Sequence, residues 1–159
     1  MAAEDYFLNI VGIPGESADA KHKGEIQVDS WSFSEQQSGT FAHGGGGGAG
    51  KVKMNDIHFS EKVSIASPKL FVRCATGEHI PRAVLTVRKA GGKQEGFLTM
   101  TFTDVLVSSY VISSSAKVPT ESITLNFAAI QVEYKPQSAD GKLGAAVRSG
   151  FDLKKMVAV

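Results

Sequence analysis

Residues 97–107 read FLTMTFTDVLV, and this stretch decides the fold class of the chain. Apolar and polar residues alternate along it, and the polar ones are mostly threonines. Because successive side chains of a β-strand point to opposite faces of a sheet, the alternation predicts a strand with one buried face. The buried face is expected to carry Leu98, Met100, Phe102 and Leu106, and the opposite face Thr99, Thr101, Thr103 and Val105.

Two further stretches alternate in the same way but change parity part-way along. The apolar residues at 26 and 28 are followed by Trp31 and Phe33 on the opposite parity, and a β-bulge near Asp29–Ser30 would bring all four to one face. A second change of parity lies near Ala128–Ala129, between the apolar residues of 123–127 and those of 130–134. We therefore expect two bent strand segments, each with one apolar face.

Strands are also expected near both ends of the sequence. Residues 6–13 are apolar on both faces, as in a strand that is covered on two sides. The pair Gly91–Gly92 predicts a hairpin turn between strands over 84–89 and 97–107. A closing strand is predicted from Phe151, Leu153, Val157 and Val159.

One segment has helical spacing instead. Ser67–Pro68 is typical of an N-cap followed by proline in the first turn, and Gly77 is typical of a helix end. The apolar stripe between them comprises Leu70, Phe71, Cys74 and Ala75. The sequence thus predicts one mainly β domain over residues 1–159: an antiparallel β-barrel or two packed sheets, with one short flanking α-helix.

The glycine tract Gly44–Gly48, followed by Ala49–Gly50–Lys51, could be a phosphate-binding loop. Such a loop opens a helix and carries Ser or Thr directly after its lysine to bind magnesium. Val52 occupies that position here, and residues 52–59 alternate as a strand does. We therefore interpret the tract as an extended glycine-rich loop between two β-strands, and we expect no nucleotide cofactor.

Composition and charge argue against several other classes. The chain has 159 residues and a formal net charge of +1, so it has no overall field to attract nucleic acid or an anionic membrane surface. No apolar run is long enough to cross a membrane, and no secretory signal sequence is evident. A local basic group is interpreted as a solvated strand face; it comprises Arg82, Arg88, Lys89 and Lys93.

No set of residues points to catalysis or to metal binding. The sequence lacks a Gly-x-Ser-x-Gly motif, and its single cysteine, Cys74, is expected to be a buried structural thiol. The four histidines are isolated, without the i,i+4 pairing or the neighbouring cysteine typical of a metal site. Solvated faces or capped turns explain the acidic pairs Glu16–Asp19 and Glu25–Asp29. We expect no catalytic residue, no metal and no cofactor.

Several short strings, spread in order along the chain, carry a family resemblance. They are Gly15-Glu16-Ser17-x-Asp19-x-x-His22, Trp31-Ser32-Phe33, the glycine tract, Ser67-Pro68-x-Leu70, Cys74-x-x-Gly77-x-His79, LTVRKAGG at 85–92, VLVSS at 105–109 and Leu125-Asn126-Phe127-Ala128. Together they resemble the Hcp family, the haemolysin-coregulated tube proteins of bacterial type VI secretion systems. The resemblance extends over nearly the whole chain.

The resemblance implies a β-barrel subunit that assembles into hexameric rings, which stack into a tube. The tube lies inside a contractile sheath, is tipped by a trimeric spike and is ejected. The protein is therefore expected to be cytoplasmic when assembled and then secreted, outside the cell or into a target cell, without a signal peptide. Family rings also carry or chaperone small effector proteins in the lumen. Neither a nucleic-acid partner nor membrane insertion is implied.

The resemblance also assigns roles to two groups of residues. The serines opposite Trp31 and Phe33 suit a water-filled lumen wall, and an ordinary exposed sheet face fits the pattern equally well. The expected lumen-facing and effector-contacting residues are Ser30, Ser32 and Ser34. The expected subunit-interface or ring-stacking loop comprises Thr40, His43, Gly44, Gly46, Gly48, Gly50 and Lys51. One alternative stays open, a monomeric β-barrel that binds a small apolar ligand.

Overall fold

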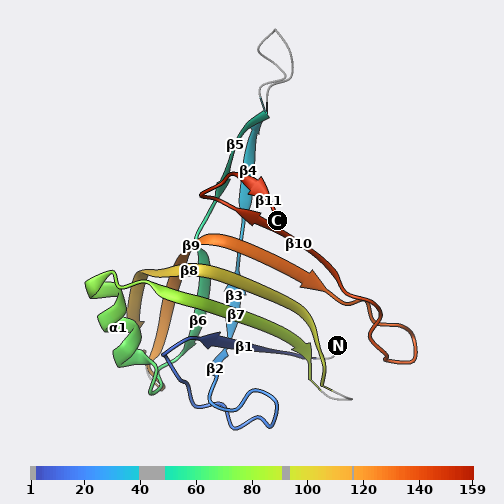
Figure 1. Cartoon of the computed structure of the whole chain (residues 1–159). Coiled ribbons are helices and arrows are strands. Elements are labelled where there is room, and N and C mark those ends of the chain that lie inside the picture. Colours follow the sequence, from blue (N-terminus) through green and yellow to red (C-terminus); the bar gives the residue numbers. More distant parts are fainter. Residues whose placement is uncertain (1–2, 40–48, 91–93, 116) are drawn as a thin grey trace.

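The computed structural model describes residues 3–39, 49–90, 94–115 and 117–159 (Figure 1). These residues form mainly antiparallel β-structure with one short helix, as the sequence predicts. In chain order the elements are β1 (Glu4–Ile10), β2 (Ile26–Val28), β3 (Ser30–Ser32), β4 (Glu35–Gly39), β5 (Ala49–Met54), β6 (Ile57–Lys62), α1 (Ser67–Thr76), β7 (Ile80–Lys89), β8 (Gly96–Ser113), β9 (Thr120–Tyr134), β10 (Val147–Asp152) and β11 (Val157–Ala158).

The strand pairings, together with the chain that passes from β2 to β3, form a circuit around the core. β1 pairs with β7, β7 with β8, β8 with β9, β9 with β6, and β6 with β3. β2 pairs with β1, and a single residue, Asp29, separates β2 from β3. The Asp29 N–H donates to the Ser60 carbonyl of β6 at 2.8 Å, so the chain changes partner strands at this residue. The fully buried side chains inside the circuit include Leu8, Ile57, Phe59, Leu85, Phe102 and Leu125.

The bulge expected near Asp29–Ser30 is a complete break between β2 and β3. The apolar residues at 26 and 28 are buried, and Trp31 and Phe33 are half-buried against the same core. The expectation that all four share one face is therefore confirmed. The serines at 30, 32 and 34 are exposed on the other side.

β8 and β9 change face at the same level of the sheet. In β9 the buried residues at 123, 125 and 127 are followed by a buried Ile130, which confirms the parity change expected at Ala128–Ala129. In β8 the corresponding change is at Asp104, which has a positive φ of 54°. The neighbouring Thr103 is paired with Ala129, so the two changes lie side by side.

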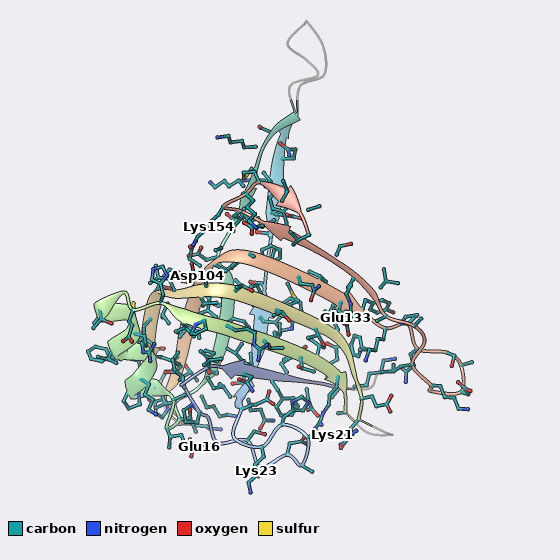
Figure 2. All side chains as sticks on the ribbon, viewed as in Figure 1. Glu16, Lys21, Lys23, Asp104, Glu133 and Lys154 are labelled. Carbon is teal, nitrogen blue, oxygen red and sulfur yellow. The ribbon has the colours of Figure 1, made fainter. Side chains whose placement is uncertain are left out.

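The face assigned to two residues of β8 was wrong for this reason. Val105 is fully buried and Leu106 is half-buried, the reverse of the sequence expectation. Asp104 takes up one residue of the alternation, so the residues from Val105 to Val107 lie on the face opposite to the one expected. The Asp104 carboxylate accepts from His79 and from Lys154, both at 2.7 Å; Asp104 and Lys154 are labelled in Figure 2. The hydrogen bond from Lys154, followed by that from His79, lowers the pKa of Asp104.

The change of face divides the sheet into two halves. Residues 120–125 of β9 pair with β6, whereas residues 129–134 pair with β10, and β8 runs along the other edge of both segments. β10 lies beside the second segment of β9, outside the circuit, and β4 and β5 project as a separate two-stranded arm (Figure 1). The expected closing strand is in fact two short ones, β10 and β11. β7 and β8 pair as the expected hairpin, and Gly91–Gly92 lie outside the described residues.

Helix α1 has the predicted end but a different start. Its N-cap is Ala66, and the Ser67 hydroxyl accepts from the Ser64 N–H at 2.9 Å instead of capping the helix. Gly77 ends the helix with a left-handed φ of 69°, as expected, and its N–H donates to the Arg73 carbonyl at 3.0 Å.

The apolar stripe expected on this helix is only partly buried. Leu70 is fully buried and Cys74 is half-buried, but Phe71 is 59% exposed and Ala75 is exposed. The reason is that α1 packs chiefly against β8 at one end of the molecule, so a narrow face of the helix is enough to cover the core there.

Residues 14–25 cover the outer side of β1. The His22 ring stacks on the Phe7 ring with centroids 4.4 Å apart, and the Arg88 guanidinium lies 4.6 Å from the same ring centroid. β1 therefore has apolar residues buried on both faces, as expected from the sequence. The loop closes on itself at Gly15, where a Cβ atom would lie 2.5 Å from the Glu25 carbonyl oxygen.

Arg88 does not lie on a solvated strand face, contrary to the sequence interpretation. It is 3% exposed, and its guanidinium donates to both carboxylate oxygens of Asp19, at 2.6 and 2.9 Å, and to Asp5 at 3.3 Å. The hydrogen bonds from Arg88 lower the pKa of Asp19 to about 2. The loop is thus fastened to the sheet by an ion pair. Arg82 and Lys89 are exposed as expected, and Lys93 lies outside the described residues.

Arg88→Met tests this fastening. Removing Arg88 leaves the carboxylates of Asp19 and Asp5, which are only partly buried, without their hydrogen-bond donor, so we expect a loss of about 2 kcal/mol in the free energy of unfolding. The loss is measured by urea denaturation at pH 7. Arg82→Met, at an exposed position of the same strand, is the control and should change stability by no more than about 0.5 kcal/mol. Equal effects of the two substitutions would contradict the role of the Arg88–Asp19 ion pair in holding the loop.

Candidate functional site: a hydroxyl-lined sheet face

The outer face of four paired strands carries two rows of small polar side chains. In the first row Ser30 of β3 is paired with Ser60 of β6, which is paired with Ser122 of β9. The second row runs across the same strands and continues into β8; it comprises Ser32, His58, Thr124 and Ser109. Because paired residues of neighbouring strands point to the same side of a sheet, these residues form one surface, which we call the hydroxyl face.

The opposite side of the same strands explains why this face is polar. Trp31, Phe59, Ile123 and Tyr110 follow one another across β3, β6, β9 and β8, and they point into the core. Alternation along each strand then places the intervening serines and threonines outside. The hydroxyl face is the outer side of a sheet whose inner side packs the core.

Hydrogen bonds connect the side chains at one end of this face. The register of β8 and β9 shifts at Val107–Ser109, so Ser108 and Ser109 both lie opposite Thr124. The Thr124 hydroxyl is 2.7 Å from that of Ser108 and 2.6 Å from that of Ser109. These contacts fix the orientation of three hydroxyl groups on neighbouring strands.

Asp56 and Asn55 extend the network between strands. The Asp56 carboxylate accepts from the Ser108 hydroxyl at 2.5 Å and from the Asn126 amide at 2.9 Å. The Asn55 amide donates to the Ser34 hydroxyl at 2.7 Å. The surface thus offers hydroxyl and amide groups to a partner. Its charged groups are Asp56 and the ion pair between Lys62 and Asp29.

The geometry suits hydrogen bonding better than nucleophilic catalysis. A serine nucleophile needs a histidine within hydrogen-bond reach. His58 lies between Ser32 and Thr124 in the register, but within the part of the chain that the structure describes it forms no hydrogen bond with either hydroxyl. The described residues also contain no cluster of three or more acidic, histidine or cysteine side chains that could hold a metal ion. Across these residues, no helix combines the length and the hydropathy needed to cross a bilayer.

The residues expected at the lumen wall come together in the structure. Ser30, Ser32 and Ser34 are all exposed, and the first two lie in the two rows of the hydroxyl face. Of the loop residues, Thr40, His43, Gly44, Gly46 and Gly48 lie outside the described residues. Gly50 and Lys51 belong to β5, which pairs with β4 and forms no helix start, as the sequence interpretation of the glycine tract requires.

Sequence reasoning missed most of the hydroxyl face. Ser60, Ser122 and Thr124 become neighbours of Ser30 and Ser32 only through the pairing of strands that are far apart in the chain. One signal was available, because polar residues alternate with apolar ones along residues 120–127. That pattern indicates a polar outer face but does not say which strands lie beside it.

Comparison with known proteins assigns the family. Residues 7–134 match the family model described as "Type VI secretion system effector, Hcp". The chain belongs to the Hcp family. It is 45% identical to Protein hcp1 of Pseudomonas aeruginosa, over 98% of each chain. The resemblance identified from the sequence strings is therefore confirmed.

Solved structures of Hcp proteins have the same fold. The crystal structure of Hcp1 from Salmonella typhimurium matches with a TM-score of 0.81 and 36% identity over the whole of both chains. A structure described as that of a type six secretion system protein matches with a TM-score of 0.93 and 27% identity, over 99% of this chain and all of the other. The circuit of strands and the flanking helix are thus features of an Hcp fold.

Thr124→Val tests the hydrogen-bond network of the hydroxyl face. The substitution keeps the shape of the side chain and removes the hydroxyl that contacts Ser108 and Ser109, so we expect a loss of about 1 kcal/mol in the free energy of unfolding. Urea denaturation measures it. Thr101→Val on β8, where no side-chain hydrogen bond is lost, controls for the change in strand propensity. A loss no larger than that of the control would show that the network does not contribute to stability.

Proposed function

We propose that this Hcp-family protein is the tube subunit of a type VI secretion system, which forms stacked hexameric rings and carries or chaperones small effector proteins in the lumen. The observation that supports this most directly is the hydroxyl face. A lumen wall must be wetted and must accept varied cargo, and small hydroxyl groups with few charges meet both requirements. Ser30, Ser32 and Ser34 are the residues we assign to effector contact.

The distribution of exposed apolar residues supports ring formation. Phe71, Val72 and Ile112 are about half exposed at the α1 end of the β8–β9 hairpin. Tyr134 and Val147, which are paired across β9 and β10, are 48% and 67% exposed at its other end. Two different apolar surfaces at opposite ends of a subunit suit a head-to-tail contact, which generates a ring when the rotation closes.

The remaining partners follow from the family and are part of the proposal. The trimeric spike and the contractile sheath contact the assembled tube, and the tube is cytoplasmic until it is ejected without a signal peptide. The whole chain acts as one domain, has no enzymatic role and uses neither a metal nor a cofactor. The alternative of a monomeric small-ligand barrel is weakened by the large side chains that fill the circuit, such as Phe59, Phe102 and Leu125.

Imaging of the purified protein tests the ring. Size-exclusion chromatography with light scattering should give the mass of six subunits, and negative-stain images should show rings with six-fold symmetry. A monomer that persists at the highest soluble concentration would refute the ring and leave the ligand-binding barrel as the better function.

Shortening the glycine tract tests how rings stack. The arm formed by β4 and β5 projects from the body, and the tract joins these two strands in the sequence, so we propose that the arm contacts the next ring (Figure 1). Deleting residues 44–48 should leave rings intact and shorten the stacks seen in electron micrographs. Lys51→Ala should leave the rings intact, and Lys53→Ala, at an exposed position of the same arm, is the control and should change neither rings nor stacks. Stacks of normal length after the deletion would contradict this role.

A further inference from the structure

Two glutamates face each other inside the protein at the α1 end. Glu61 of β6 is paired directly with Glu121 of β9, and they are 1% and 2% exposed. Both lie on the core side of their strands, in line with Phe59 and Ile123, which are fully buried. Two acidic side chains therefore occupy core-facing positions, which are otherwise apolar in these two strands.

Most of their oxygen atoms have no hydrogen-bond partner. The Tyr110 hydroxyl donates to Glu121 Oε2 at 2.7 Å. Both carboxyl oxygens of Glu61 and the other oxygen of Glu121 are buried without a partner. Buried polar groups are nearly always hydrogen-bonded, so three unpartnered carboxyl oxygens in one place require an explanation.

The charged groups near Glu61 and Glu121 do not neutralise the negative charge of these carboxylates. Asp29, near the start of β3, adds a further negative charge, and Lys62 pairs with Asp29 at 3.9 Å from an exposed position. Arg73 on α1 pairs with Glu78, and Lys69 on α1 is exposed.

From the loop over residues 14–25, Glu16 accepts the Ile65 N–H at 3.1 Å. Within the described chain, no basic side chain forms an ion pair with Glu61 or Glu121.

Two carboxylates in such a position cannot both be ionised without a large cost. Burial disfavours the charged form of Glu61, and the neighbouring Glu121 adds repulsion between like charges. Burial, followed by repulsion from Glu121 and Asp29, raises the pKa of Glu61 to about 8. Burial and the hydrogen bond to Glu121 raise the pKa of Tyr110 to about 12, so its hydroxyl remains a donor throughout the physiological range.

The pair is connected to helix α1 in two ways. The Tyr110 ring, which contacts Glu121 through its hydroxyl, meets the Phe71 ring edge-on with centroids 6.3 Å apart. Along the chain, four residues join Lys62 at the end of β6 to Ser67 at the start of the helix, and the Val63 N–H donates to the Pro119 carbonyl at 3.1 Å. A displacement of either carboxylate would therefore also shift α1 and the start of β9.

We propose that Glu61 and Glu121 form a proton-binding pair that keeps the α1 end of the subunit packed while it holds a proton and loosens that end when both carboxylates are charged. The alternative occupant of the site, a bound cation, is an outcome of the test below. The proposal rests on the monomer alone and does not depend on the proposed tube function.

The sign of the pH dependence follows from linkage. The native protein holds a proton on Glu61 that the unfolded chain releases above about pH 4.5, so the native state loses stability as the pH rises from that value to about 8 and then levels off. One such proton changes the unfolding constant by about tenfold for each pH unit in this window. Glu61→Gln replaces the protonated acid by a neutral group of the same shape and should remove this dependence.

The experiment is urea denaturation between pH 5.5 and 8.5, in buffer treated with a chelator, for the native sequence, Glu61→Gln and Glu95→Gln. Glu95 is exposed, and its substitution controls for the loss of one negative charge. We expect the unfolding constants of the native protein and Glu95→Gln to rise with pH, and that of Glu61→Gln to stay nearly flat. Hydrogen exchange corrected for its intrinsic pH dependence should show residues 67–76 losing protection in the native protein as the pH rises.

Several results would overturn the proposal. They are parallel profiles for all three proteins, or a native protein that the chelator destabilises and added Mg²⁺ or Ca²⁺ restores, which would make the pair a cation site. If Glu61→Gln does not fold, the infrared band of a protonated carboxyl group in the native protein at pH 7 decides the matter. Its presence and its loss as the pH is raised above 8 support the pair, and its absence at pH 7 refutes it.

Discussion

The edge that β9 shares between two partners is the constraint on which the rest of the structure depends. A strand has two edges, and β8 occupies one of them along its whole length, so β6 and β10 must divide the other. The division coincides with the change of face at Asp104 in β8 and at Ala128–Ala129 in β9. On one side of this level β9 pairs with β6, and on the other it pairs with β10, while β7 pairs with residues 96–105 of β8.

A non-glycine residue in the left-handed region is uncommon, and Asp104 is held there by contacts from two directions. His79, just before β7, and Lys154, between β10 and β11, both donate to its carboxylate. The same residue that ends the alternation in β8 therefore also connects the two halves of the sheet. The Arg88–Asp19 ion pair has a similar role on the far side of the circuit, where it fastens the loop over residues 14–25 to β7.

Features of the fold could be predicted from the sequence where they depend on residues close together in the chain, and not where they depend on the pairing of distant strands. Parity changes at 29–30 and 128–129 are visible in the spacing of apolar residues, and both were predicted at the right place. Asp104 was not, because an aspartate in an alternating strand looks like any other polar residue. Arg88 was assigned to solvent because its partner Asp19 is 69 residues away in the chain. The same limit applies to the hydroxyl face and to the Glu61–Glu121 pair, which exist only once β6 and β9 are paired.

The proposed lumen wall is the hydroxyl face. Its polarity follows from the alternation of four strands whose other side fills the core, so a wall of this composition needs no residues beyond those that build the sheet. The most direct test is a cryo-electron microscopy reconstruction of the assembled protein. We predict that the Ser32 side chain and its neighbours in β6 and β9 point into the central channel. A ring in which this face lies on the outer surface, or is covered by the adjacent subunit, would contradict the account.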